Sequence, residues 1–137
     1  MDNSKTDEVF FPKKIRGTIY LLGEWGKDFV YKIGVTRGSI EKRIKKLQTG
    51  NSGDIYLLTK FASSHPFVLE KMLHNAFYAN SIRGEWFEIK DERFEQQFLL
   101  KCEEFEKALE CLEKNNIFFQ KKYCNGSFTT GKETNQI

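Results

Sequence analysis

Three residues have side-chain types and positions suited to chemistry on a phosphate group: Arg43, His74 and Glu85. Arg43 borders the apolar side of an expected helix. Its stem either lies on the core with the guanidinium in solvent, or the guanidinium is held over a sheet for a bidentate grip on a phosphate. Glu85 follows a turn at Gly84, either as a solvated strand end or as a metal ligand. His74 stands four residues after Glu70, which gives either a surface pair at helical spacing or an orienting, proton-shuttling imidazole facing the sheet.

Motifs of other catalytic classes are missing from the sequence. It has no GxSxG, P-loop or HExxH motif, only two histidines, and three cysteines without a CxxC pair. Any metal chemistry must therefore rest on carboxylates, which favour a hard ion such as Mg²⁺ held by one or two of them.

Charge is distributed unevenly along the chain, although the net charge is only +3. Residues 1–60 contain twelve Lys and Arg against seven Asp and Glu, whereas residues 85–113 contain four against ten. A polyanion would therefore bind the first half of the chain. The basic residues that would contact backbone phosphates without reading bases are Lys13, Lys14, Arg16, Arg37, Lys42, Lys45 and Lys46. The alternative is that these charges form an ordinary solvated face.

Residue alternation, apolar periodicity and turn residues predict the elements that would position these groups. A β-hairpin is expected first, with strands at 16–22 and 29–36. Ser39 is the expected N-cap and Gly50 the stop of a helix over 40–49. The later elements are a third strand, a helix beginning at Pro66, a short extended segment and a long final helix, at 55–62, 66–80, 85–89 and 91–115.

This order predicts one domain of the α/β (α+β) class, with a small three-stranded, mainly antiparallel sheet flanked by helices. We expect a flexible lead-in at 1–14, a core carrying the candidate site at 15–90, a C-terminal helix packed on that core at 91–123, and a disordered tail at 124–137. The polar N-terminus and the lack of a long apolar run predict a soluble, cytoplasmic protein that does not contact a membrane.

Four short blocks give the candidate residues a more specific context. In chain order they are YKIGVT at 31–36, KRIKKLQTG at 42–50, LEKMLH at 69–74 and GEWF at 84–87. Together they resemble the GIY-YIG nuclease superfamily, and more closely its phage- and virus-rich DNA-binding branch. The resemblance covers residues 17–90 and implies the GIY-YIG-like fold.

The resemblance also implies roles for individual residues. Tyr20 matches the tyrosine that helps to deprotonate or orient the attacking water, and Arg43 matches the arginine that stabilises charge on the phosphoryl group. Glu85 matches the glutamate that holds a single divalent ion, Mg²⁺ or Mn²⁺, which polarises the scissile phosphate. With Lys32 and His74 these residues complete the expected catalytic set.

The sequence departs from the family pattern in both tripeptides that name it. Thr18 replaces the first glycine, and Lys32 occupies the position of the second tyrosine. Strand alternation turns the adjacent Tyr31 to the other face, as a packing residue. Lys32 would contact a phosphate, lower the pKa of Tyr20, or mark a site that binds DNA without cutting it.

Three functions are therefore expected, in order of preference. The first is a DNA-binding, divalent-metal-dependent endonuclease, acting in the host cell if the protein is viral. The second keeps the fold and the DNA binding but lacks catalysis. The third is a protein-interaction domain that uses the acidic, heptad-like final helix and forms a homodimer through it.

Overall fold

The computed structural model describes residues 15–115, so Lys13, Lys14, the expected lead-in and the expected tail lie outside the described residues. Residues Ile15–Lys107 form one compact unit. The description below concerns this unit, which carries all the other candidate residues.

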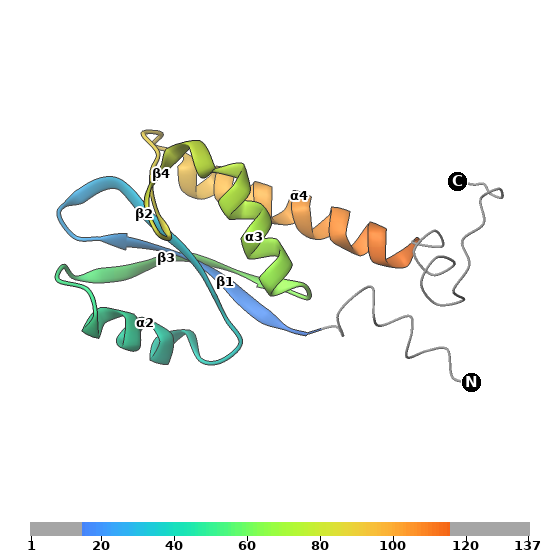
Figure 1. The fold of residues 1–137 in the computed structure, drawn as a ribbon, viewed down its shortest axis with the longest axis horizontal. Coiled ribbons are helices and arrows are strands. Elements are labelled where there is room, and N and C mark those ends of the chain that lie inside the picture. The colour runs from blue at the N-terminus through green and yellow to red at the C-terminus, as the bar shows by residue number, and fades with distance from the viewer. Residues whose placement is uncertain (1–14, 116–137) are drawn as a thin grey trace. The chain divides into compact units, whose positions relative to one another are not determined.

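The unit contains a five-stranded antiparallel sheet (Figure 1). Its strands are β1 (Gly17–Glu24), β2 (Lys27–Thr36), β3 (Ile55–Ser63), β4 (Ser81–Arg83) and β5 (Trp86–Glu88), in the order β3-β1-β2-β5-β4. The expected three-stranded sheet is therefore wrong. The segment 81–84, expected only to break a helix, supplies β4, and β5 extends the sheet from the edge of β2.

The two added strands have three residues each, and β5 lies within the extended segment expected at 85–89. The strand β4 was not expected, because all three of its residues are exposed and alternation gives no signal there. The two strands are joined at Gly84, whose φ of +55° is a conformation that glycine adopts without steric cost. Pairing of β5 with β2, and of β4 with β5, rather than local propensity, makes these residues strands.

Three α-helices accompany the sheet within the described residues: α2 (Ile40–Thr49), α3 (Pro66–Ala76) and α4 (Phe94–Lys114), with a 3₁₀ turn at Tyr78–Asn80. The predicted start of α2 is confirmed, because the Ser39 hydroxyl accepts a hydrogen bond from the Lys42 backbone N–H at 3.2 Å. Gly50 is its C-cap, and Pro66 occupies the first turn of α3, as predicted.

The helices divide between the two faces of the sheet, with α2 on one side and α3 and the first part of α4 on the other (Figure 1). Alternation along β1 sends Tyr20 and Leu22 to the α2 face, where they pack with Ile40 and Ile55. Tyr31 points to the opposite face and lies 4.8 Å, between ring centroids, from Phe94. Its prediction as a packing residue is confirmed.

A buried acid on α4 holds this helix to the end of β3. Glu106 accepts hydrogen bonds from the Ser63 hydroxyl and the Ser64 backbone N–H, both at 2.7 Å. The three residues are at most 9% exposed, so the carboxylate is screened little by water. None of the described helices has the length and apolar character needed to cross a membrane.

Candidate functional site

Tyr20 is placed by the strand pairing that runs through the first hairpin. It lies directly opposite Gly34, and a Cβ added at Gly34 would overlap the end of the phenol ring. Only glycine therefore leaves room for Tyr20 at this point of β2. The same register puts Lys32 opposite Leu22, on the face that also carries Tyr20.

Arg43 reaches this face from α2 and is fixed there by the tyrosine. Its Nε donates a hydrogen bond to the Tyr20 hydroxyl at 3.2 Å, and its side chain is half-buried. The guanidinium is thus anchored over the sheet rather than left to solvent. The pKa of Arg43 is raised, mainly by Tyr20 and to a smaller extent by the charges of Glu85 and Glu70.

The environment of Tyr20 opposes ionisation of its phenol. Burial raises the pKa of Tyr20, and the hydrogen bond and charge of Arg43 offset this only in part. The residue is 0% exposed. The suggested lowering of this pKa by Lys32 is not found, and Tyr20 remains a neutral phenol at neutral pH.

Lys32 instead pairs with the expected metal ligand. Its Nζ lies 3.1 Å from Oε1 of Glu85 and 5.5 Å from the centre of the Trp86 ring. Glu85 is brought there by β5, because its carbonyl accepts a hydrogen bond from the Ile33 N–H at 3.2 Å and Trp86 pairs with Lys32 in the ladder. The carboxylate side chain remains 43% exposed.

His74 connects α3 to β2 rather than standing as a surface residue. Its Nε2 lies 3.0 Å from the Ile33 carbonyl oxygen and 3.6 Å from Oε2 of Glu70, so this nitrogen carries a proton and donates it. The pKa of His74 is raised, first by the hydrogen bond to Glu70 and then by the Ile33 carbonyl, with burial acting against both. The sequence paired Glu70 with His74 but did not predict the carbonyl.

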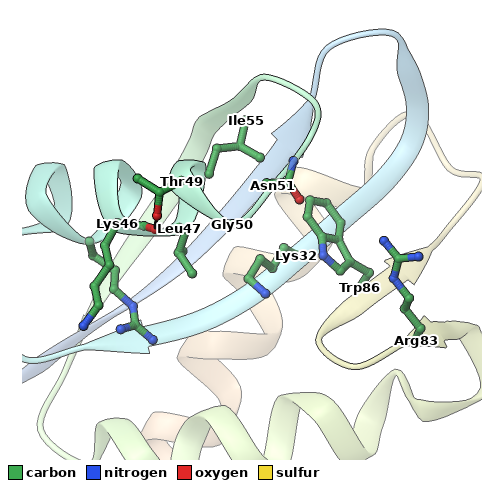
Figure 2. Close-up of a pocket in the computed structure, with 10 residues that line it drawn as sticks. Lys32, Lys46, Leu47, Thr49, Gly50, Asn51, Ile55, Arg83 and Trp86 are labelled. Carbon is green, nitrogen blue, oxygen red and sulfur yellow. Dashed lines mark hydrogen bonds between the residues drawn. The ribbon is translucent and has the colours of Figure 1, made fainter.

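A pocket of about 450 Å³ opens beside these residues, between α2, β2 and the β4–β5 hairpin (Figure 2). Ten residues line it: Lys32, Arg43, Lys46, Leu47, Thr49, Gly50, Asn51, Ile55, Arg83 and Trp86. Six of these lining residues belong to the sequence blocks KRIKKLQTG (42–50) and GEWF (84–87). The presence of both blocks in one sequence could have suggested that they line a shared cavity. Arg83 has no such signal, because β4 itself was not predicted.

The T5orf172 domain family matches residues 17–116, which is most of the chain. The chain belongs to this family. The T5orf172 domain is a GIY-YIG-like, phage-associated domain related to nucleases, so the resemblance seen in the sequence is supported at that level. Comparison with curated proteins and with solved structures gave no match.

Five of the seven basic residues expected to meet a polyanion lie within the part of this T5orf172 domain that the structure describes. Those that the structure describes are all exposed: Arg16, Arg37, Lys42, Lys45 and Lys46. Of these, Lys46 also lines the pocket.

The groups available for a metal ion are few. Within residues 15–115, no group of three or more His, Cys, Asp or Glu side chains is arranged to hold one. Mg²⁺ keeps several waters and is commonly bound by one or two carboxylates. The exposed Glu85 carboxylate of the T5orf172 domain therefore fits a largely hydrated ion, which would compete with the Lys32 ammonium.

Proposed function

We propose that this T5orf172 domain binds DNA on its α2 face and hydrolyses phosphodiester bonds with a divalent ion, Mg²⁺ or Mn²⁺. The observation that carries the proposal is the hydrogen bond from Arg43 Nε to the Tyr20 hydroxyl. It fixes a guanidinium from the more basic half of the chain in the pocket that Lys32 also lines, and Lys32 pairs with the expected metal ligand, Glu85.

Arg43 has the role of binding the phosphoryl group. Its Nε is used by Tyr20, which leaves the N–H groups of both terminal nitrogens for two oxygens of one phosphate. A guanidinium held in advance stabilises developing negative charge without having to reorient. Tyr20 then acts as a positioning residue for Arg43, because its buried, neutral phenol is unsuited to removing a proton from water.

Glu85 would hold the divalent ion. When bound, such an ion polarises the scissile phosphate and lowers the pKa of coordinated water. Lys32 contributes a positive charge beside the same carboxylate, and can transfer its hydrogen bonds from Glu85 to a phosphate oxygen. His74 holds α3 against β2, next to the strand residues that carry the site.

The exposed basic residues supply affinity for the DNA backbone. Each Lys or Arg that neutralises a phosphate releases condensed counterions, so the affinity should fall steeply with salt concentration. Lys13 and Lys14, which lie outside the described residues, are proposed to add to this surface together with Arg16, Arg37, Lys42, Lys45 and Lys46.

The proposal is tested by incubating supercoiled plasmid with the protein and Mg²⁺ or Mn²⁺. Wild type should nick the plasmid, and Arg43→Ala and Glu85→Gln should each reduce nicking by about 100-fold or more. Matched controls are Arg93→Ala and Glu95→Gln, which remove the same charges from exposed positions at the start of α4. Absence of both nicking and a gel shift at low salt would overturn the proposal.

A second function, DNA binding without cleavage, is favoured by one contact. The Lys32–Glu85 ion pair occupies the carboxylate that a metal ion would need. A salt-sensitive gel shift by wild type without nicking would support this function. In that case Lys32→Met, which removes the competing ammonium, is expected to bring nicking, and its failure to do so would show that the ion pair is not what prevents cleavage.

A further inference from the structure

We propose that the pocket lined by Arg83, Lys46 and Trp86 binds one unpaired nucleotide of the DNA strand that is bound at Arg43. This inference rests on the proposed function and specifies its substrate class. It assigns a role to Arg83 and to the β4–β5 hairpin.

The pocket is strongly cationic. Four of its lining residues are basic (Lys32, Arg43, Lys46 and Arg83), and none of the lining residues among those described is acidic. Lys32 is paired with Glu85 and Arg43 with Tyr20. Lys46 and Arg83 have no ion-pair partner within residues 15–115. Figure 2 shows these two on opposite sides of the pocket, with Lys32 and Trp86 between them, so an anionic ligand lying in the pocket would have a cation at either end.

The pocket also has an apolar part that an inorganic anion would leave uncovered. Leu47, Ile55 and Trp86 contribute it, and the three residues belong to one core cluster below the pocket. A cavity of about 450 Å³ falls in the size range of small-molecule sites, which combine apolar walls with a few polar groups. A nucleotide, with a phosphate at one end and a base at the other, matches both parts.

One wall of the pocket is fixed before any ligand binds. The Gln48 side chain donates to the Gly53 carbonyl at 2.8 Å and accepts from the Ile55 N–H at 2.9 Å. The Asn51 side chain also donates to the Gly53 carbonyl at 2.8 Å. The loop that carries Gly50 and Asn51 into the pocket is therefore held in place, which lowers the entropic cost of binding.

The size of the pocket separates unpaired from paired DNA. Side chains from α2 and from the β4–β5 hairpin enclose it on two sides (Figure 2). A base pair within a duplex cannot enter such a space, whereas a single nucleotide outside the stack can. Arg43 lines the same pocket, so the enclosed nucleotide would adjoin the phosphate bound by Arg43.

The test uses thymidine 5′-monophosphate and the fluorescence of Trp86. The chain has two tryptophans, so Trp25→Phe, a change at a residue 71% exposed, leaves Trp86 as the only reporter. In this background we expect the nucleotide to change the emission and to bind at least about tenfold more tightly than inorganic phosphate. Arg83→Gln should weaken nucleotide binding about tenfold, whereas Arg93→Gln should not. Equal binding of phosphate and nucleotide, or no effect of Arg83→Gln, would overturn the inference.

A second measurement separates this inference from the proposed function. Wild type should bind a duplex with a short unpaired gap more tightly than the intact duplex, and Arg83→Gln should remove this preference. If plasmid nicking is absent but thymidine monophosphate binds, only the nuclease proposal fails. If nicking occurs while the nucleotide does not bind and the gap has no effect, the pocket inference alone is wrong.

Discussion

The two faces of the sheet differ in what their side chains contribute. On the α3–α4 face, Ile33, Phe87, Phe94 and Phe98 are at most 1% exposed. On the α2 face, a small apolar cluster around Tyr20 adjoins the cationic pocket and the Arg43 and Lys32 contacts. The α3–α4 face buries apolar area that stabilises the fold. This stability allows the α2 face to keep like charges close together, which is unfavourable until an anion binds.

Phe94→Ala should have the largest effect, and on stability alone. The ring contacts Tyr31, Phe77 and Phe98, with centroid distances of 4.8, 5.2 and 6.2 Å. Removing it should lower the free energy of unfolding by about 3 to 5 kcal/mol, measured by urea denaturation. DNA affinity of the folded fraction should stay within about twofold of wild type. A specific loss of DNA binding would show that the two faces are not separable.

Gly34→Ala should affect both stability and function. The added Cβ would overlap the Tyr20 ring, and such overpacking costs about 1 to 3 kcal/mol. Displacing the Tyr20 ring would also disturb its hydrogen bond with Arg43. Both the nicking rate and the free energy of unfolding should therefore decrease. Gly38→Ala is the control, because a Cβ there meets nothing within 4 Å. Equal effects of the two substitutions would contradict the close approach of Tyr20 to Gly34.

Tyr20→Phe should cost less stability but act on Arg43 directly. It removes one hydrogen bond to a charged group, and the free energy of unfolding should fall by about 1 to 2 kcal/mol. Because Tyr20 positions Arg43, the nicking rate should drop while the pH dependence of the remaining nicking keeps its shape. Loss of a basic limb from the pH–rate profile would instead identify Tyr20 as the group that takes the proton. Tyr78→Phe, at a residue 76% exposed, is the control.

His74 should give the smallest effect, visible in how stability depends on pH. The folded-state pKa is raised above the ordinary 6.5, chiefly by Glu70. This stabilisation is fully present below pH 6.5 and is lost as the pH rises through the raised folded-state value. The groups that face His74 are Glu70, the Ile33 carbonyl, Phe87 and, at longer range, Glu85.

In urea denaturation, wild type should therefore lose stability between about pH 6 and pH 8, and His74→Gln should lose less. Glu70→Gln should flatten the wild-type dependence in the same direction. If His74→Gln lost as much stability as wild type over this pH range, the pH dependence of stability would come from groups other than His74.

The sequence by itself determined the parts of this protein that depend on local patterns. Alternation along residues 17–36 placed Tyr20 and Lys32 on one face and Tyr31 on the other, as the strand register confirms. Ser39, Gly50 and Pro66 marked helix ends because capping and proline geometry act within one turn. Arg43 was recognised as unusual because it borders an apolar stripe.

Only the tertiary structure decided which distant groups meet. The strand β5 joins the sheet at the edge of β2 and β4 joins it at β5, and the three exposed residues of β4 have no pattern of their own. The contacts of Lys32 with Glu85, of His74 with the Ile33 carbonyl, and of Glu106 with Ser63 join residues far apart in the chain. Such contacts depend on the closing of loops around a common core, and residue type and spacing do not encode their geometry. For the same reason Arg83 could be assigned to the pocket only after the sheet was known.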